Sequence, residues 1–355
     1  MSKDLFAFVG TYTRLGSEGI YTLRLNAETG EVTKVSTATG LENPSFVALD
    51  PTNDHLYAIS ETSAFNGSGG ITAFSINKET GELTQINQQS TQGPGPCHLV
   101  VDASDSSVVV ANYAGGSVSV HTVNEDGSVN AGTDFVQHEG SSVNERRQQE
   151  AHAHSATLNS TNDKVYICDL GMDQVLTYNL DTVNGKISLA GSVDSDAGEG
   201  PRHFTFHPNN KWVYVNNELG NTVSVYDVAS DESLTQKQKI STLPEGWEGV
   251  SHTADIHTSI DGKFLYCSNR GHDSLAIYSI DQSDGTLTHI GNESTQGNTP
   301  RNFAMTPDGR YILAENQDSD SVVTFKIEDD GTLTPTGSVL ELPAPVCIQW
   351  MPVGG

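Results

Sequence analysis

One short sequence pattern recurs seven times along the chain, and it restricts the possible folds more than any other feature. Each copy starts at a proline, alanine or threonine and runs into a short apolar stretch, as in NPSFVALDP (43–51) and GPRHFTFHPN (200–209). Successive copies begin 52, 57, 48, 52, 47 and 45 residues apart, at Pro44, Pro96, Ala153, Pro201, Thr253, Pro300 and Pro345. Repeats of roughly 40–50 residues with four strands each are typical of propeller blades.

Two further patterns follow the first one within each repeat. A polar turn leads into a second strand that ends in small or polar residues, as in KWVYVNNELG (211–220). An alternating stretch such as NTVSVYDV (221–228) comes next. Alternation predicts half-buried strands, and Gly or Asp-Gly turns predict tight hairpins. No stretch shows a sustained helical period, so we expect an all-β protein.

The two ends of the chain indicate how the ring closes. The last copy, APVCIQWMP (344–352), supplies only a first strand, whereas LFAFVGTYT (5–13) opens with the second-strand pattern. The two ends therefore share one blade. The sequence predicts one domain over residues 1–355, a seven-bladed β-propeller closed by a blade shared between the N- and C-termini. An open solenoid would need polar capping repeats, which the sequence does not show.

The charge of the chain excludes several classes of partner. It has 18 Lys and Arg against 45 Asp and Glu, a net charge of −27. Such a surface repels nucleic acid and anionic membranes. No apolar run approaches the ~20 residues of a membrane span, and MSKDLFAFVG is a poor signal peptide. We expect a cytoplasmic protein whose four widely spaced cysteines are buried free thiols.

Equivalent positions of the blades meet at one rim of the channel, so we compare two slots across the repeats. The first slot follows each lead residue and holds Ser45, Cys97, His154, Arg202, Ala254, Arg301 and Val346. The second slot follows the second strand and holds Glu61, Tyr113, Leu170, Glu218, Arg270 and Gln317. Neighbouring blades thus bring together His154, Arg202, Glu218 and Arg270, with Arg301 nearby.

Arginine is concentrated at these slots. The chain has eight arginines; three occupy the slots, and Arg146 and Arg147 lie just ahead of His154. Guanidinium groups bind carboxylates or phosphates and stabilise an oxyanion, while His and Glu are candidate general bases. The alternative is structural, because buried Arg–Glu pairs also tie blades together.

Other polar residues near the slots carry a weaker signal. His152 lies beside the cluster, and a strand-end residue, often Asn, precedes the second slot in most blades, as Asn217 and Asn269 do. Asn oxygens bind calcium, but the ladder has too few carboxylates for a metal site, so we expect no metal and no cofactor. His98 and His203 recur as a pattern and are interpreted as structural hydrogen-bonding residues. The chain lacks GxSxG, HExxH, P-loop and GxGxxG motifs.

With these residues the chain resembles the seven-bladed propeller lactonases of the bacterial 6-phosphogluconolactonase type, over almost its whole length. The most specific stretches are NERRQQEAHAHS (144–155), GPRHFTFHPNNKWVYVNNELGNTVSVY (200–226) and DGKFLYCSNRGHDSLAIY (261–278). The fold also resembles fungal carboxymuconate lactonizing enzymes. The resemblance implies a catalytic set of His154, Arg202, Glu218 and Arg270. The chain departs from its relatives at Asp255, where they often have Glu, and at Glu150–Ala151, where a proline is common.

The resemblance implies hydrolysis of 6-phospho-glucono-1,5-lactone in the pentose phosphate pathway, so the expected ligand is an anionic sugar lactone. Glu218 or His154 would act as the base, and Arg202 and Arg270 would stabilise the oxyanion or hold the substrate. The expected substrate-binding residues are Arg301, Arg147, His152, Asn217, Asn269 and Gln317. Three alternatives stay open: lactone formation or opening on a dicarboxylate such as a muconate, a non-catalytic binding propeller, and a calcium-dependent lactonase.

Overall fold

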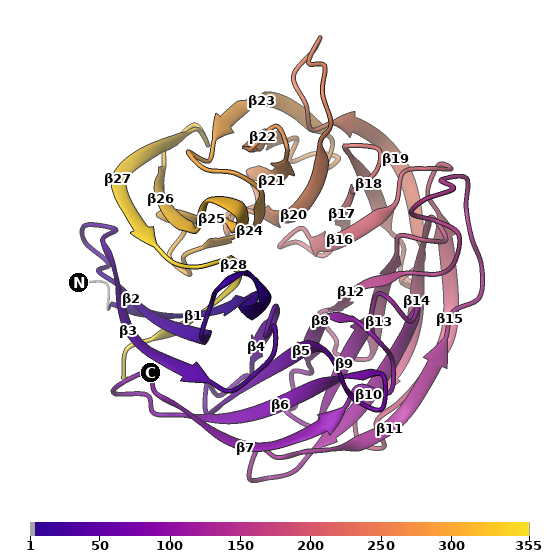
Figure 1. Cartoon of the computed structure of the whole chain (residues 1–355). Helices are drawn as coiled ribbons and strands as arrows, with labels where there is room; N and C mark the ends of the chain where they lie inside the picture. The colour runs from indigo at the N-terminus through magenta and orange to yellow at the C-terminus, as the bar shows by residue number, and fades with distance from the viewer. Residues whose placement is uncertain (1–3, 355) are drawn as a thin grey trace.

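Seven four-stranded antiparallel sheets surround a central axis in the computed structural model of the chain, which describes residues 4–354 (Figure 1). The predicted all-β, seven-bladed propeller is confirmed. In each blade the first strand lies innermost and the fourth lies at the outer edge (Figure 1).

The strands of the first four blades have the following bounds. Blade 1 consists of β28 (Pro345–Pro352), β1 (Leu5–Thr11), β2 (Gly19–Leu25) and β3 (Val32–Thr39). Blade 2 consists of β4 (Val47–Leu49), β5 (His55–Phe65), β6 (Ser68–Ile76) and β7 (Leu83–Ser90). Blade 3 consists of β8 (Pro96–Val101), β9 (Ser107–Asn112), β10 (Ser117–Val123) and β11 (Val129–Gln137). Blade 4 consists of β12 (Ala153–Leu158), β13 (Lys164–Asp169), β14 (Gln174–Asp181) and β15 (Lys186–Asp194).

The remaining blades follow the same order. Blade 5 consists of β16 (Pro201–Phe206), β17 (Trp212–Asn217), β18 (Thr222–Val228) and β19 (Leu234–Ser241). Blade 6 consists of β20 (His252–Thr258), β21 (Phe264–Arg270), β22 (Ser274–Ile280) and β23 (Leu287–Ser294). Blade 7 consists of β24 (Pro300–Met305), β25 (Tyr311–Asn316), β26 (Ser321–Ile327) and β27 (Leu333–Glu341). Two short 3-10 turns, η1 (Thr13–Leu15) and η2 (Gln317–Ser319), follow β1 and β25.

Blade 1 closes the ring as the chain ends predict. Strand β28 pairs antiparallel with β1, from Leu5 opposite Pro352 to Gly10 opposite Cys347. In Figure 1 the yellow C-terminal strand lies against the indigo N-terminal strand. Closure leaves no gap between the first and last repeats, so no blade face is left exposed at an open end.

Apolar faces of neighbouring blades pack against each other around the ring. Between blades 4 and 5, for example, Tyr166 and Cys168 lie in one cluster with Phe204, Val213 and Val215, all of them buried. A tyrosine of the second strand also hydrogen-bonds a hairpin of the next blade in five places: Tyr57 to Gly127, Tyr166 to Glu232, Tyr214 to Gly285, Tyr266 to Gly331 and Tyr311 to Glu28, each to the backbone oxygen. These contacts hold adjacent blades in register.

A β-bulge in the inner strand aims the first-slot residue of most blades. The pairing register skips one residue of the inner strand at Cys97, His154, Arg202, Arg301 and Val346. An extra residue in one strand bends it and redirects the bulged side chain. The repeated bulge therefore brings first-slot residues from different blades to the same end of the channel.

Candidate active site

A cavity of about 350 Å³ occupies the end of the channel where the inner strands begin. Its wall is formed by first-slot residues, by second-slot residues and by a loop of blade 4. The lining residues are Glu61, Gly95, Cys97, Tyr113, Ala114, Arg147, His154, Glu218, His252, Arg270 and Arg301. Six of the seven blades contribute, so the site exists only in the closed ring.

Glu218 lies at the centre of the predicted arginine cluster and contacts three guanidinium groups. Its Oε1 accepts a hydrogen bond from Arg147 Nη2 at 2.7 Å. Its Oε2 accepts from Arg202 Nε at 2.9 Å and lies 2.9 Å from Arg270 Nη2. Both carboxylate oxygens are thus occupied, and the side chain is only 4% exposed. Arg202 has a further fixed contact from Nη1 to the backbone oxygen of Ala254.

The loop between β11 and β12 delivers Arg147 to this cluster. The Asn144 side chain accepts hydrogen bonds from the backbone N–H groups of Arg146 and Arg147, at 3.1 and 3.2 Å, and so shapes the turn. The buried Gln148 then anchors the loop, because its amide donates to the backbone oxygen of Leu170 at 2.9 Å. Arg147 Nη2 also donates to the Tyr113 hydroxyl at 3.0 Å.

The electrostatics of the cluster keep Glu218 ionised. Burial alone would raise the pKa of Glu218, but Arg270, Arg202 and Arg147 together lower it far below its ordinary value. Burial lowers the pKa of Arg202 to about 9, with Arg270 and Arg301 adding to the effect, which still leaves the guanidinium protonated at pH 7. A carboxylate held by three cations is a weak proton acceptor. Glu218 is therefore suited to orienting the arginines.

His154 presents a neutral imidazole to the same cavity. Burial lowers its pKa well below the ordinary value, and Arg202, His203, Arg301 and Arg270 lower it further. Within residues 4–354 its buried Nδ1 has no hydrogen-bond partner, and its ring meets Tyr113 edge-to-face at 5.4 Å between centroids. The neutral imidazole has a nitrogen that can accept a proton, and the surrounding cations make it only weakly basic.

Arg301 is the cavity guanidinium without a fixed anionic partner. Within residues 4–354 it has no hydrogen bond or ion pair, and its guanidinium lies 5.6 Å from the centre of the Tyr12 ring. The cavity wall carries Arg147, Arg270 and Arg301 together with the carboxylates of Glu61 and Glu218, and Arg202 lies directly behind Glu218. These four guanidiniums outnumber the two carboxylates, so the site attracts anions although the whole chain is strongly acidic.

Comparisons with known proteins show the family of the chain. The family described as "Lactonase, 7-bladed beta-propeller" matches residues 6–350. The chain belongs to the seven-bladed β-propeller lactonase family. A 6-phosphogluconolactonase of Bacillus subtilis is 38% identical over 97% of both chains, and one of Formosa agariphila is 36% identical over 96% of both. The structure of a periplasmic gluconolactonase of Pseudomonas aeruginosa superposes with a TM-score of 0.93 at 29% identity, covering 99% of each chain.

A second hydrogen-bonded network continues from the arginine cluster along the channel. Arg202 Nη1 lies 3.1 Å from His203 Nε2, and His203 Nδ1 lies 2.8 Å from Asp255 Oδ1. Asp255 Oδ2 accepts from His257 Nε2 at 2.9 Å. His203 thus makes the structural hydrogen bonds that the sequence predicts, and Asp255 holds it in place. This hydrogen-bonded network ends at a cavity of about 310 Å³ at the opposite mouth of the channel. Apolar side chains make up half of the residues that line this cavity.

Four predicted substrate-binding residues do not line the cavity that contains the arginine cluster. Asn217 and Asn269 are fully buried; the Asn217 amide donates to the hydroxyls of Thr222 and Ser224, and the Asn269 amide donates to a backbone oxygen. Gln317 lies in η2 and contacts Asp318. His152 stacks on Tyr113 at 4.5 Å between ring centroids and supports the wall from behind. The strand-end Asn ladder mainly satisfies groups within the blades.

Besides Gly95 and Ala114, four residues with reactive or polar side chains line the cavity although the sequence did not single them out as site residues. Glu61, Tyr113 and Cys97 occupy the two slots, so their position in the repeat was the signal, but their types differ from the Arg–Glu–His set. His252 precedes the lead residue of blade 6 and gave no signal. Burial raises the pKa of the Cys97 thiol above 9, and its Sγ lies 3.1 Å from the His154 backbone oxygen, so it is no thiolate nucleophile.

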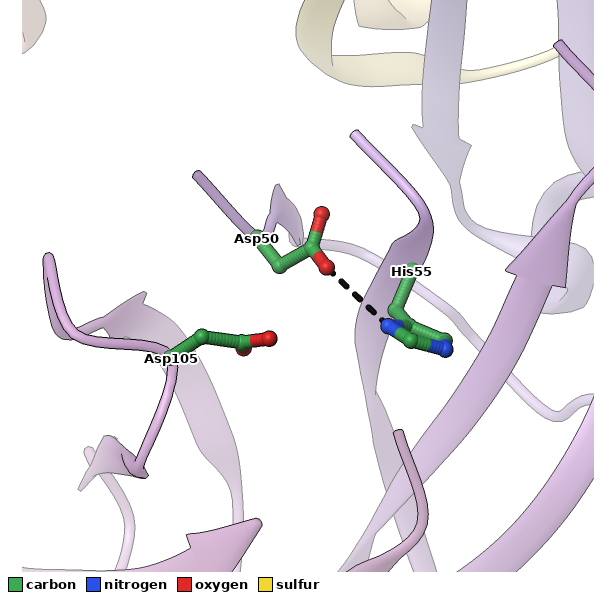
Figure 2. Close-up of side chains that lie close together, drawn as sticks. All are labelled: Asp50, His55 and Asp105. Atoms are coloured by element: carbon green, nitrogen blue, oxygen red, sulfur yellow. Dashed lines mark hydrogen bonds and ion pairs between the residues drawn. The ribbon is translucent and has the colours of Figure 1, made fainter. Parts of the chain in front are cut away.

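The residues that could hold a metal ion lie elsewhere. Among residues 4–354, one group of three metal-type ligands has its atoms within 4.8 Å of each other, namely Asp50, His55 and Asp105. Figure 2 shows Asp105 directed toward the bonded pair of Asp50 and His55. Two carboxylates and an imidazole are ligands that divalent cations take. The group lies at turns that follow the inner strands, at the opposite end of the blades from the arginine cluster.

This group yields a stability prediction for Asp105→Asn. At the next blade interface the equivalent Asn162 donates to Asp102 at 3.1 Å, whereas the buried Asp105 Oδ1 has no partner in the part of the chain that the structure describes. Burial and Asp50 raise the pKa of Asp105 to about 6, above its unfolded value of about 3.9. Ionisation therefore destabilises the wild type as the pH rises from about 4 to 6. Because solvent screens this partly exposed group, we expect the variant to gain only ~1 kcal/mol at pH 8.

Urea unfolding of both proteins at pH 4 and pH 8 measures this gain. The difference should be small at pH 4, where Asp105 carries a proton in the folded protein and in about half of the unfolded chains, and larger at pH 8. An equal change at both pH values would contradict the prediction. Asp163→Asn is a matched control, because hydrogen bonds from the neighbouring Thr161 and Asn159 lower the pKa of that exposed carboxyl.

Proposed function

We propose that this lactonase hydrolyses 6-phospho-glucono-1,5-lactone to 6-phosphogluconate. The observation that carries the proposal is the cluster of four guanidiniums at one cavity of a chain with net charge −27. Their charge exceeds that of the two carboxylates by two, which suits a phosphate dianion. The names of the Bacillus subtilis and Formosa agariphila relatives support the same substrate.

The reaction needs a base, a group that stabilises the oxyanion and a group that binds the phosphate. Water adds to the lactone carbonyl carbon, the carbon–ring oxygen bond breaks, and the proton lost by water ends on the released ring oxygen. Arg270 points a guanidinium into the cavity wall and is anchored by Glu218 and by the Thr253 backbone oxygen. A fixed cation of this kind stabilises the charge that develops on the carbonyl oxygen.

The contacts favour His154 over Glu218 as the base. Glu218 is occupied by three guanidiniums, whereas the His154 imidazole makes no side-chain hydrogen bond within the described residues. A δ-lactone is a reactive ester, so a weakly basic imidazole is sufficient. Arg301 takes the phosphate because its guanidinium has no fixed partner; Arg147 keeps its bond to Glu218 and supports the phosphate from the rim.

The wider context of the enzyme follows from its substrate. We propose a role in the pentose phosphate pathway and a cytoplasmic location, where the four free cysteines stay reduced. The acidic surface gives no support for binding nucleic acid or anionic membranes. Within residues 4–354, no helix is long and apolar enough to cross a membrane.

Direct measurement of lactone decay tests the proposed function. Freshly made 6-phosphogluconolactone is followed with and without enzyme, and the product is trapped by a coupled dehydrogenase. We expect clear acceleration over spontaneous opening, unchanged by a chelator. Acceleration that the chelator abolishes would favour a calcium-dependent lactonase. No acceleration, together with turnover of a muconate-derived lactone, would favour the dicarboxylate alternative.

A variant of Arg301 tests the phosphate site. We expect Arg301→Ala to raise KM for 6-phosphogluconolactone by roughly 10- to 100-fold, the size of one lost charge-assisted hydrogen-bonded contact. KM for unphosphorylated glucono-1,5-lactone should change little. An equal loss on both lactones would place Arg301 at the reacting carbonyl.

A further inference from the structure

Glu61 is a second carboxylate of the cavity, and it stands in the same slot of blade 2 that Glu218 occupies in blade 5. It lies in β5, between Ser60 and Phe65, where the pairing with β6 breaks. Its side chain is 22% exposed. Glu61 lines both the main cavity and the narrow passage below it, and Arg301 lines the same two spaces.

Two hydroxyl groups fix one oxygen of Glu61 and leave the other free. Oε1 accepts hydrogen bonds from Tyr12 Oη at 2.8 Å and from Ser45 Oγ at 2.5 Å. Oε2 has no hydrogen bond within the described residues, and its ion-pair contact is Arg14 Nη1 at 3.8 Å, a side chain that is 51% exposed. Glu61 is thus held in one orientation with an unused acceptor.

The contrast with Glu218 separates the roles of the two carboxylates. Three guanidiniums occupy both oxygens of Glu218, whereas Glu61 keeps the acceptor capacity of one oxygen. Arg301, conversely, has donors without an acceptor among residues 4–354. The passage therefore offers an unused cationic donor close to an unused anionic acceptor. A ligand that carries both an anionic group and hydroxyl groups satisfies both.

We propose that Glu61 accepts a hydrogen bond from a ring hydroxyl of the substrate and so selects polyhydroxylated lactones over dicarboxylate lactones. The inference rests on the proposed function and deepens it. A hydroxyl bound to a carboxylate forms a strong, short hydrogen bond. A second carboxylate on the substrate would meet the like charge of Glu61, and a deoxy lactone would leave Oε2 without a partner.

Steady-state kinetics of the wild type and Glu61→Gln on a set of lactones test this proposal. The set contains 6-phosphogluconolactone, its 2-, 3- and 4-deoxy analogues, and a muconate-derived dicarboxylate lactone. Glutamine keeps the shape and an acceptor for Tyr12 and Ser45 but removes the charge. We expect kcat/KM for the full substrate to fall about tenfold, mainly through KM, as for a weakened charge-assisted hydrogen bond. One deoxy lactone should show no difference between the two proteins.

Two results would overturn the inference while leaving the proposed function intact. One is an unchanged kcat/KM of the variant on the full substrate. The other is the same loss on every lactone of the set, which would indicate a base or a structural role. Tyr12→Phe, which removes a single hydrogen bond to Glu61, gives a second variant if Glu61→Gln unfolds. A wild type inactive on all phosphorylated lactones would instead refute the proposed function itself.

Discussion

Glu218→Gln is expected to lower the free energy of unfolding by about 3 kcal/mol at pH 7 and to reduce kcat/KM by more than 100-fold. The stability loss follows because Arg202 is 3% exposed and would remain charged and buried without its counter-ion. The activity loss follows because Arg147, Arg202 and Arg270 repel one another once the carboxylate is neutral. Urea unfolding and the lactone assay measure the two effects.

A matched control separates the cluster from an ordinary ion pair. Glu328→Gln removes a carboxylate that pairs with Lys326 at 2.6 Å at the surface, where the Lys326 side chain is 57% exposed and the Glu328 side chain 32%. Exposed pairs contribute roughly 0–1 kcal/mol, so this variant should match the wild type in activity and nearly in stability. Equal stability of Glu218→Gln and the control would show that Arg202 can be buried without its partner, contrary to the proposed electrostatics.

Arg270→Ala is expected to reduce kcat by roughly 10²- to 10³-fold, the usual effect of removing one oxyanion donor. Its Nη2 is held at 2.9 Å from Glu218 and 3.2 Å from the Thr253 backbone oxygen, so the guanidinium is fixed before substrate arrives. KM should change less than kcat because the charge that Arg270 stabilises develops in the transition state. Steady-state kinetics at pH 7, corrected for spontaneous opening, measure both constants.

Arg24→Ala serves as the control for the arginine variant. Arg24 pairs with Asp4 at the surface and is 51% exposed, so its removal changes net charge without touching the cavity. We expect wild-type kinetics. Full activity of Arg270→Ala would refute the mechanism, because it would show that the carbonyl oxygen does not need the Arg270 guanidinium.

The sequence predicted the blades because each blade meets the same physical demand. A four-stranded sheet with both faces packed against neighbours needs alternating apolar strands and tight turns, and this pattern is visible seven times. The same regularity explains why comparing equivalent positions found His154, Arg202, Glu218 and Arg270. Arg202 and Arg270 prove to share one carboxylate oxygen of Glu218, although 68 residues separate them.

The sequence predicted some site residues wrongly where the direction of a side chain, and not its position in the repeat, decides whether it reaches the cavity. Asn217 is the last residue of β17 and Glu218 the first residue after it, and consecutive side chains at the end of a strand point in different directions. Asn217 turns into the blade, whereas Glu218 turns into the cavity. Gln317 shares the slot of Glu218 yet lies in a 3-10 turn away from the cavity. Glu61 was passed over because its importance depends on which of its oxygens is left without a partner.

The chain by itself determined the all-β class, the number of blades, the shared closing blade and the rim where polar residues gather, because periodicity is written in residue types. Only the tertiary structure decided which rim residues share a cavity and what each is free to do. Bulges in the inner strands set the direction of Cys97, His154, Arg202 and Arg301. Three arginines occupy both carboxylate oxygens of Glu218, whereas within residues 4–354 one oxygen of Glu61 and the guanidinium of Arg301 have no hydrogen bond. Such contacts depend on which atoms meet in the folded protein, so the sequence alone does not show them.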